Sequence, residues 1–196
     1  MKTYIRLFKS VTSLLLLFTL CHNAYADEFT WFGNKAEGNW LIGLKGSSVQ
    51  SGRIGHDDSS NSSVLLGYKF SGLDKFGGTS SLEFEMSNAF DEGDILNGGQ
   101  FSGPGEWKSN TVGVYITYRG KGSVYALGKI GALKTDVSTT IGNIEQEEQD
   151  TSLSYGGGLG LNLGESGNFN VELEFVGSSG DNDINMITLG GIYRFE

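Results

Sequence analysis

Residues 153–163 read Leu-Ser-Tyr-Gly-Gly-Gly-Leu-Gly-Leu-Asn-Leu. Every odd position except Gly157 carries a large apolar side chain, and every even position carries Ser, Gly or Asn. A period of two places successive side chains on opposite faces of a β-strand, whereas an amphipathic helix needs a period near 3.6. The stretch therefore predicts a strand with one apolar face and one face of very small side chains.

The same alternation recurs in seven further segments, and no segment shows a helical period of useful length. The eight strands are expected at 39–50, 61–72, 78–91, 107–120, 122–136, 150–164, 167–179 and 184–196. Their connections alternate between long and tight: the longer, polar links are 51–60, 91–106, 137–149 and 180–183, and the tight ones are 71–77, 120–121 and 165–166. An even number of strands with long loops on one side is typical of a transmembrane β-barrel.

The composition restricts the class of protein. Of 196 residues, 31 are Gly and one is Pro, without a triplet period, which excludes collagen, and twenty Phe and Tyr are too many for a disordered chain. The net charge of −9, without a basic stripe, argues against a nucleic-acid partner. The mean hydropathy is slightly negative and no run of 18 apolar residues occurs, so no transmembrane helix is expected.

Residues 1–26 have the three parts of a secretory signal peptide: a basic leader, an apolar run of about ten residues and the small-x-small site Ala24-Tyr25-Ala26. We expect cleavage after Ala26. The only cysteine, Cys21, would be removed with this segment, and Leu20 before it is not the small residue that lipid attachment requires. The mature chain, 27–196, would carry 11 basic and 23 acidic side chains, a net charge of −12, and no thiol chemistry.

The face of small residues decides between a soluble and a membrane-embedded barrel. A soluble eight-stranded barrel such as a lipocalin turns its apolar face inward, and Gly38-Asn39-Trp40 matches the short Gly-x-Trp signature of that family. A water-facing exterior has no need of so many glycines, whereas the interior of eight strands is narrow and needs small side chains. We therefore place the small residues in the lumen and the apolar residues against lipid.

Charged residues punctuate the small-residue face, and their signs nearly balance. Buried charges need partners. We expect Glu85 to pair with Lys69 or Arg119, which lie on the strands flanking its own. We expect Glu174 to pair with Arg194 on the neighbouring strand. Lys129 is placed inward on a strand whose two faces are both partly apolar. The predicted lumen network comprises Lys45, Lys69, Glu83, Glu85, Arg119, Lys129, Glu172, Glu174 and Arg194.

The last strand ends in Thr188-Leu-Gly190-Gly-Ile-Tyr193-Arg-Phe195, which resembles the final-strand signal of outer-membrane β-barrels. Together with 66–70 and 155–163, this segment makes the chain similar to the OmpA-type and OmpX-type eight-stranded outer-membrane barrel family, without a peptidoglycan-binding domain. The resemblance implies recognition of Thr188, Gly190, Tyr193 and Phe195 by the barrel-assembly machinery. One departure is Glu196, because the family usually ends on the aromatic residue itself.

Catalytic and metal-binding chemistry find little support in the sequence. The one histidine of the mature chain, His56, lies beside Asp57, Asp58 and Ser59, but a polar loop does not hold a Ser-His-Asp triad in its required geometry. The acidic stretches 145–150 and 181–183 lack the ligand spacing of an EF-hand. We expect no enzyme, no cofactor and no metal site, with a divalent-cation bridge to lipopolysaccharide as a weaker hypothesis.

The sequence thus predicts an all-β chain: a signal peptide at 1–26, a periplasmic N-terminal segment at 27–38, and a closed eight-stranded antiparallel up-and-down transmembrane β-barrel at 39–196. The expected location is the outer membrane of a Gram-negative bacterium, among lipid and lipopolysaccharide. The expected role is structural or one of surface interaction through acidic extracellular loops, with the lumen plugged by the charged network. The alternatives are a narrow pore for small solutes or ions and a soluble lipocalin-like periplasmic carrier.

Overall fold

The computed structural model describes residues 30–31, 34–35, 40–52, 57–70, 77–95, 105–142, 144–163, 168–180 and 183–195. The chain divides into two units, 1–36 and 37–196. In the first unit the described residues form a small antiparallel hairpin of β1 (Thr30–Trp31) and β2 (Asn34–Lys35). The alternation in the sequence did not predict these two short strands.

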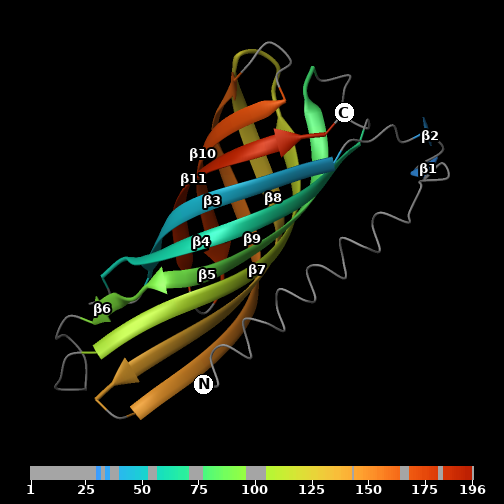
Figure 1. Ribbon diagram of the computed structural model, residues 1–196. Coiled ribbons are helices and arrows are strands. Elements are labelled where there is room, and N and C mark those ends of the chain that lie inside the picture. Colours follow the sequence, from blue (N-terminus) through green and yellow to red (C-terminus); the bar gives the residue numbers. More distant parts are fainter. Residues whose placement is uncertain are drawn as a thin grey trace. The chain divides into compact units, whose positions relative to one another are not determined.

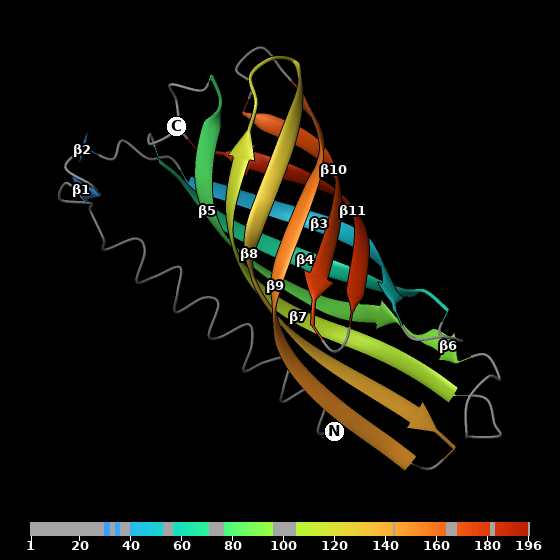
Figure 2. The same ribbon diagram turned by 180° about the vertical axis from the view of Figure 1, so that it is seen from behind.

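The second unit is a closed β-barrel in which every long strand is antiparallel to both of its neighbours (Figures 1 and 2). The circular order is β3-β4-β5-β7-β8-β9-β10-β11, and β11 pairs with β3 to close the circle. The long strands are β3 (Trp40–Ser51), β4 (Ser59–Phe70), β5 (Thr79–Asp91), β7 (Gly105–Arg119), β8 (Val124–Ile141), β9 (Ile144–Leu163), β10 (Phe169–Ser179) and β11 (Ile184–Arg194). The short β6 (Gly93–Ile95) pairs with the beginning of β7. The prediction of an eight-stranded antiparallel barrel is confirmed.

The apolar face of each strand lies on the outside of the barrel. Leu44, Leu82 and Leu161 are exposed large apolar side chains, whereas Lys45 and Glu83, which follow Leu44 and Leu82 in the sequence, are 4% and 1% exposed. An apolar exterior around a polar interior suits a barrel surrounded by lipid. Because this arrangement is the inverse of a soluble carrier, the lipocalin-like alternative is wrong.

Two tight turns depend on glycine. Gly122, in the turn between β7 and β8, has φ of 119°, and Gly142, in the turn between β8 and β9, has φ of 60°. Both values lie in the left-handed region, which an L-residue with a Cβ atom rarely adopts. The sequence predicted the first of these turns at 120–121, and it did not predict the second.

The second turn belongs to the largest correction. Residues 137–149, predicted as a polar loop, continue β8 and β9 as a paired hairpin from Val137 opposite Glu148 to Ile141 opposite Ile144. These strands and the start of β7 project beyond β10 and β11 (Figures 1 and 2). The prediction failed because residues 144–149 are exposed on both faces and the opposing residues 138–140 are all polar, so these strands lack the alternation on which the assignment rested.

Among the residues that the structure describes, no helix is long and apolar enough to cross a membrane.

Candidate functional site

The candidate site is the lumen, whose two ends we name for what lies there. The terminal end is where β3 begins, at Trp40, and where β11 finishes, at Arg194. The loop end is the opposite one, where the hairpin of β8 and β9 projects. Along each strand the inward side chains follow one another at every second position, so their order in the sequence gives their order along the lumen.

Four side chains from four strands form a closed group of ion pairs in mid-lumen, which we call the lysine ring. Lys45 Nζ lies 2.6 Å from Glu174 Oε1 and 3.0 Å from Glu85 Oε2. Lys129 Nζ lies 2.6 Å from Glu174 Oε2 and 3.3 Å from Glu85 Oε2. The ring is electrically neutral, and Lys129 also lies 4.5 Å from the centroid of the Tyr115 ring, within cation–π range.

A second group, the arginine cluster, lies nearer the terminal end. The Arg119 guanidinium is bidentate to Glu172, with Nε 2.6 Å from Oε1 and Nη2 3.0 Å from Oε2, and its Nη1 also donates to Glu83. Tyr125 donates its hydroxyl to Glu172, and Thr117 donates to Glu83 at 2.9 Å. Both carboxylates are thus paired with the same guanidinium and carry additional hydrogen bonds, as buried charges require.

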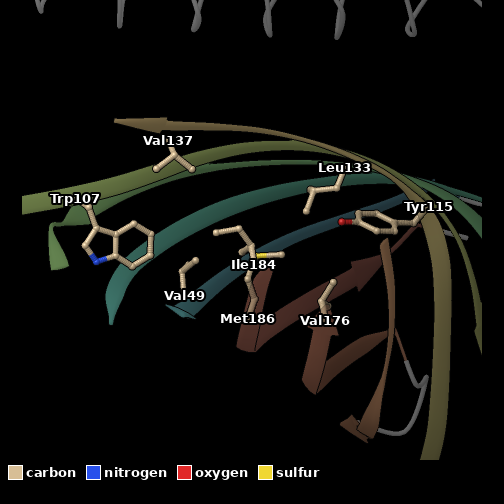
Figure 3. Close-up of a cluster of buried hydrophobic side chains, with 8 residues drawn as sticks. All are labelled: Val49, Trp107, Tyr115, Leu133, Val137, Val176, Ile184 and Met186. Carbon is tan, nitrogen blue, oxygen red and sulfur yellow. The ribbon is translucent and has the colours of Figure 1, made fainter. Parts of the chain in front are cut away.

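The loop end of the lumen is filled by apolar side chains, which we call the apolar layer (Figure 3). They come from β3, β7, β8, β10 and β11 and point toward one another in the interior. Ile95 of β6 packs against them. The layer consists of Val49, Trp107, Tyr115, Leu133, Val137, Val176, Ile184 and Met186. Close-packed apolar side chains leave little room for water between them.

Trp107 connects the apolar layer to the residue Asp57, before β4, and through it to β6. Its indole N–H donates to the carbonyl oxygen of Asp57 at 2.7 Å, and the Asp57 amide donates to the carbonyl of Asp94 at 2.8 Å. A Cβ atom on Gly93 would lie 2.4 Å from Trp107 Nε1, so only glycine fits against the indole there. The short strand β6 is therefore held against the loop end of the lumen.

The predicted pairing of the lumen charges was wrong for Glu85 and Glu174, which meet lysines from strands that are not their neighbours. Lys69 lies opposite Ser81, two inward positions along β5 from Glu85. Arg194 lies opposite Leu41 on β3, whereas the β11 partner of Glu174 is Thr188. The prediction considered only adjacent strands, but the interior of eight strands is narrow enough for side chains to reach across it.

Lys69 and Arg194 are both half-buried at the terminal end. Within the described part of the chain, neither side chain has an ion pair or a hydrogen bond. The structure thus brings seven of the nine predicted charges into two clusters and leaves these two cations outside them.

Inward glycines make room for the large lumen side chains. A Cβ atom on Gly190 would lie 2.3 Å from Lys45 Cγ, one on Gly160 would lie 2.2 Å from the Tyr125 ring, and one on Gly113 would lie 2.3 Å from the Tyr115 ring. Real Cβ atoms do not approach other heavy atoms so closely. Each of these glycines faces one lumen side chain whose packing it permits.

The two tyrosines and the apolar layer were absent from the predicted network. Tyr125, Leu133 and Val176 stand at inward positions of strands that also carry Lys129 or Glu174. Extending the alternation past the charged positions would have found them. The search was confined to charges, although an interior also needs volume.

The other predicted residues lie in three places. Thr188 and Gly190 face the lumen, with Thr188 Oγ1 3.2 Å from Ser47 Oγ, while Tyr193 packs edge-to-face on Phe195 outside, with ring centroids 4.9 Å apart. Ala24, Ala26, His56 and Glu196 lie outside the described residues. In the acidic stretch 181–183, only Asp183 is described, and among the described residues no group of three His, Cys, Asp or Glu side chains could hold a metal ion.

An acidic hollow of about 670 Å³ lies on the loop-end surface, with Asp57, Asp91, Glu92, Glu106 and Lys108 in its lining. The hydrogen bond from Lys108 holds the pKa of Glu92 below its usual value, and the same contact raises the pKa of Lys108. Glu92 in turn raises the pKa of Glu106, through a hydrogen bond and charge repulsion. Lys108 and Glu106 stand past the last apolar outward residue of β7, Val112, and so lie beyond the membrane-spanning part.

Solved structures of eight-stranded barrels share this fold. Ail of Yersinia pestis is 22% identical, with a TM-score of 0.51 over 83% of this chain and 100% of that one. Neisserial surface protein A is 10% identical, with a TM-score of 0.52 over 83% of this chain and 100% of that one. The N-terminal barrel domain of Pseudomonas aeruginosa OprF is 15% identical, with a TM-score of 0.51 over 81% of this chain and 100% of that one.

No curated protein sequence matches the chain. The model of the family described as outer membrane protein beta-barrel domain matches residues 12–195, nearly the whole chain. This match agrees with the apolar exterior, the closed sheet and the predicted resemblance. The chain belongs to the outer membrane protein β-barrel domain family and is an OmpA-like protein of the outer membrane of a Gram-negative cell.

Proposed function

We propose that the chain is a non-enzymatic outer-membrane protein whose lumen is closed and whose loop end acts outside the cell. The observation that carries this proposal is the content of the lumen: the arginine cluster and the lysine ring, followed toward the loop end by the apolar layer. An ion crossing the barrel would have to displace two paired clusters and then pass a packed layer of mostly apolar side chains. Apolar constrictions close channels by excluding water.

Planar-bilayer recordings test the closure. We expect no channels from the wild type and none from Glu85→Ala, which breaks the lysine ring but leaves the apolar layer intact. A double variant, Glu85→Ala with Ile184→Ala, weakens both barriers and is expected to conduct. Channels in the wild type would overturn the closed lumen in favour of the narrow pore, which is the second candidate function.

The loop end supports a role in surface interaction. Carboxylates far outnumber the cations Lys108 and Lys134 among its described residues: they include Asp57, Asp58, Asp91, Glu92, Asp94, Glu106, Glu145, Glu147 and Glu148. One structure of Ail holds the heparin analogue sucrose octasulfate, a polyanion. The acidic loop end here would repel such a ligand, so we propose a cationic or neutral partner.

Binding measurements with two probes test this choice. We expect a lysine-rich peptide, but not sucrose octasulfate, to bind the protein in nanodiscs at low salt, with affinity falling as ionic strength rises. Glu147→Gln with Glu148→Gln should weaken peptide binding, and Glu172→Gln, inside the barrel, is the matched control. Binding of sucrose octasulfate at low salt would contradict the proposal.

The remaining partners follow from the surface of the barrel. The outward side chains support contact with lipid, and lipopolysaccharide is the proposed neighbour in the outer leaflet. Thr188, Gly190, Tyr193 and Phe195 stay a predicted assembly signal. Their test is the rate at which Tyr193→Ala gains heat-modifiable gel mobility in the presence of the assembly machinery, compared with Tyr155→Ala, an outward tyrosine on β9.

A further inference from the structure

Among the residues that the structure describes, the terminal end of the lumen holds more cations than carboxylates. The cations are Arg119, Arg194 and Lys69, and the carboxylates are Glu83 and Glu172 of the arginine cluster. Both carboxylates are bonded to Arg119. The lysine ring above cannot supply a partner, because each of its carboxylates is already shared by its two lysines.

Arg194 stands close to this balanced cluster without joining it. It is the last residue of β11 and is paired in the ladder with Leu41, and its charge acts on Arg119, Tyr125 and Glu172. Two guanidinium groups therefore lie in each other's field inside a narrow barrel. Like charges in such a place repel, and an anion between them would offset the repulsion.

A buried side-chain amide, that of Asn170, faces the same end. Asn170, inward on β10, is 0% exposed, and in the described part of the chain neither its Nδ2 nor its Oδ1 atom has a hydrogen bond. Its ladder partner on β11 is Ile192, which is followed on the same face by Arg194. More than nine in ten buried polar groups find a partner, so an unsatisfied N–H group beside an unpaired cation points to an acceptor.

We propose that Arg194, Asn170 and Lys69 form a binding site for a small oxyanion at the terminal end of the lumen. A guanidinium presents several N–H donors in a plane and matches the geometry of phosphate and carboxylate oxygens. The Asn170 amide adds a donor from the neighbouring strand, and Lys69 adds charge. The acceptor is an oxyanion rather than a cation or a neutral sugar, because two of the three groups are cations.

Titration with inorganic phosphate tests the site on the full chain in nanodiscs, at constant ionic strength maintained with chloride. The probes are the NMR signals of Arg194 Nε–Hε and the Asn170 side-chain amide. We expect saturable shifts of both, and binding weakened about tenfold or more in Arg194→Gln, because a charge-assisted contact is lost. The matched control is Lys108→Gln, a cation at the loop end, which should bind phosphate as the wild type does.

Acetate serves as a second ligand to separate two sources of oxyanion. Saturation by phosphate alone assigns the site to phosphate groups, and saturation by both extends it to carboxylates. If Arg194→Gln fails to fold, as judged by heat-modifiable mobility, Lys69→Gln takes its place with the same expected direction. Shifts that never saturate, or binding unchanged in the folded variant, would overturn the proposal. The outcome is independent of the conductance recordings, because a closed lumen and a conducting one can both bind an anion at this end.

Discussion

The terminal and loop halves of the lumen are built on the same strands, but ion pairs dominate the first, beside a small apolar cluster of Leu41, Leu65 and Ile192, and apolar packing dominates the second. On β8, Lys129 and Leu133 point inward four residues apart, the first into the lysine ring and the second into the apolar layer. On β10, Glu174 likewise belongs to the lysine ring and Val176 to the apolar layer. The ionic half depends on particular atoms meeting, whereas apolar burial is non-directional and roughly proportional to area. The ionic half therefore specifies which strands face one another, and the apolar half contributes stability and excludes water.

The largest expected effect comes from removing the cation of the arginine cluster. Arg119→Met leaves Glu83 and Glu172 buried without their guanidinium, and we expect a loss of about 3–5 kcal/mol in the free energy of unfolding. Urea unfolding in lipid vesicles, followed by heat-modifiable mobility, measures it. The triple variant with Glu83→Gln and Glu172→Gln should recover much of the loss. No recovery would show that the cluster contributes energy beyond charge neutralisation.

A truncation in the apolar layer should lower the free energy of unfolding by less than Arg119→Met does. No compensating change of charge should restore it. Leu133→Ala removes a 1% exposed side chain and leaves a cavity, for an expected loss of about 3 kcal/mol. The matched control on the outside is Leu44→Ala, whose side chain is 68% exposed on the lipid face and leaves no internal cavity. Equal losses for the two variants in the same unfolding experiment would mean that the apolar layer is not packed as described.

A smaller loss of stability is expected from filling the space that an inward glycine leaves beside the lysine ring. Gly190→Ala places a methyl group 2.3 Å from Lys45 Cγ and 2.9 Å from the carbonyl oxygen of Leu44. Overpacking of this kind costs about 1–3 kcal/mol, at the lower end if the flexible lysine stem can shift. Gly46→Ala is the control, because nothing lies within 4 Å of its added Cβ atom. Vesicle unfolding of the two variants should separate them.

The smallest expected effect lies outside both halves, at the exposed pair Lys108–Glu92. The pKa of Glu92 is lowered in the folded state, so its contribution is present above its usual value of 4.5 and is lost as the pH falls through the lower, folded value. The raised pKa of Glu106 acts in the opposite sense, stabilising the fold at low pH and losing that effect as the pH rises through the folded value. Glu106→Gln should therefore steepen the fall of stability between about pH 5 and pH 3, by a small amount because solvent screens such exposed groups. Unfolding curves across that range check the slope, and an unchanged slope would contradict the coupling.

The sequence was sufficient to predict the barrel but only part of its interior. Alternation placed Lys45, Glu83 and Arg119 in the lumen because the period of a strand is fixed by its backbone. It could not predict that Lys45 meets Glu174, because that contact depends on barrel width and stagger, which no single strand encodes. It also missed the strand at 144–149, where Glu145, Gln146 and Glu147 are polar on both faces and only the ladder with β8 keeps them extended.

The lysine ring has one more consequence, for the order in which the molecule assembles. Lys45 and Glu174 are 129 residues apart and lie on either side of the seam where β3 joins β11. While the sheet is still open, the two charges have no fixed partner across the seam, and when the sheet curls shut they neutralise each other. Contacts of such long sequence separation form late, because the chain must first lose the entropy of closing the loop. The other three ion pairs of the ring join strands on one side of the seam, so closing the sheet adds the pair that completes the ring.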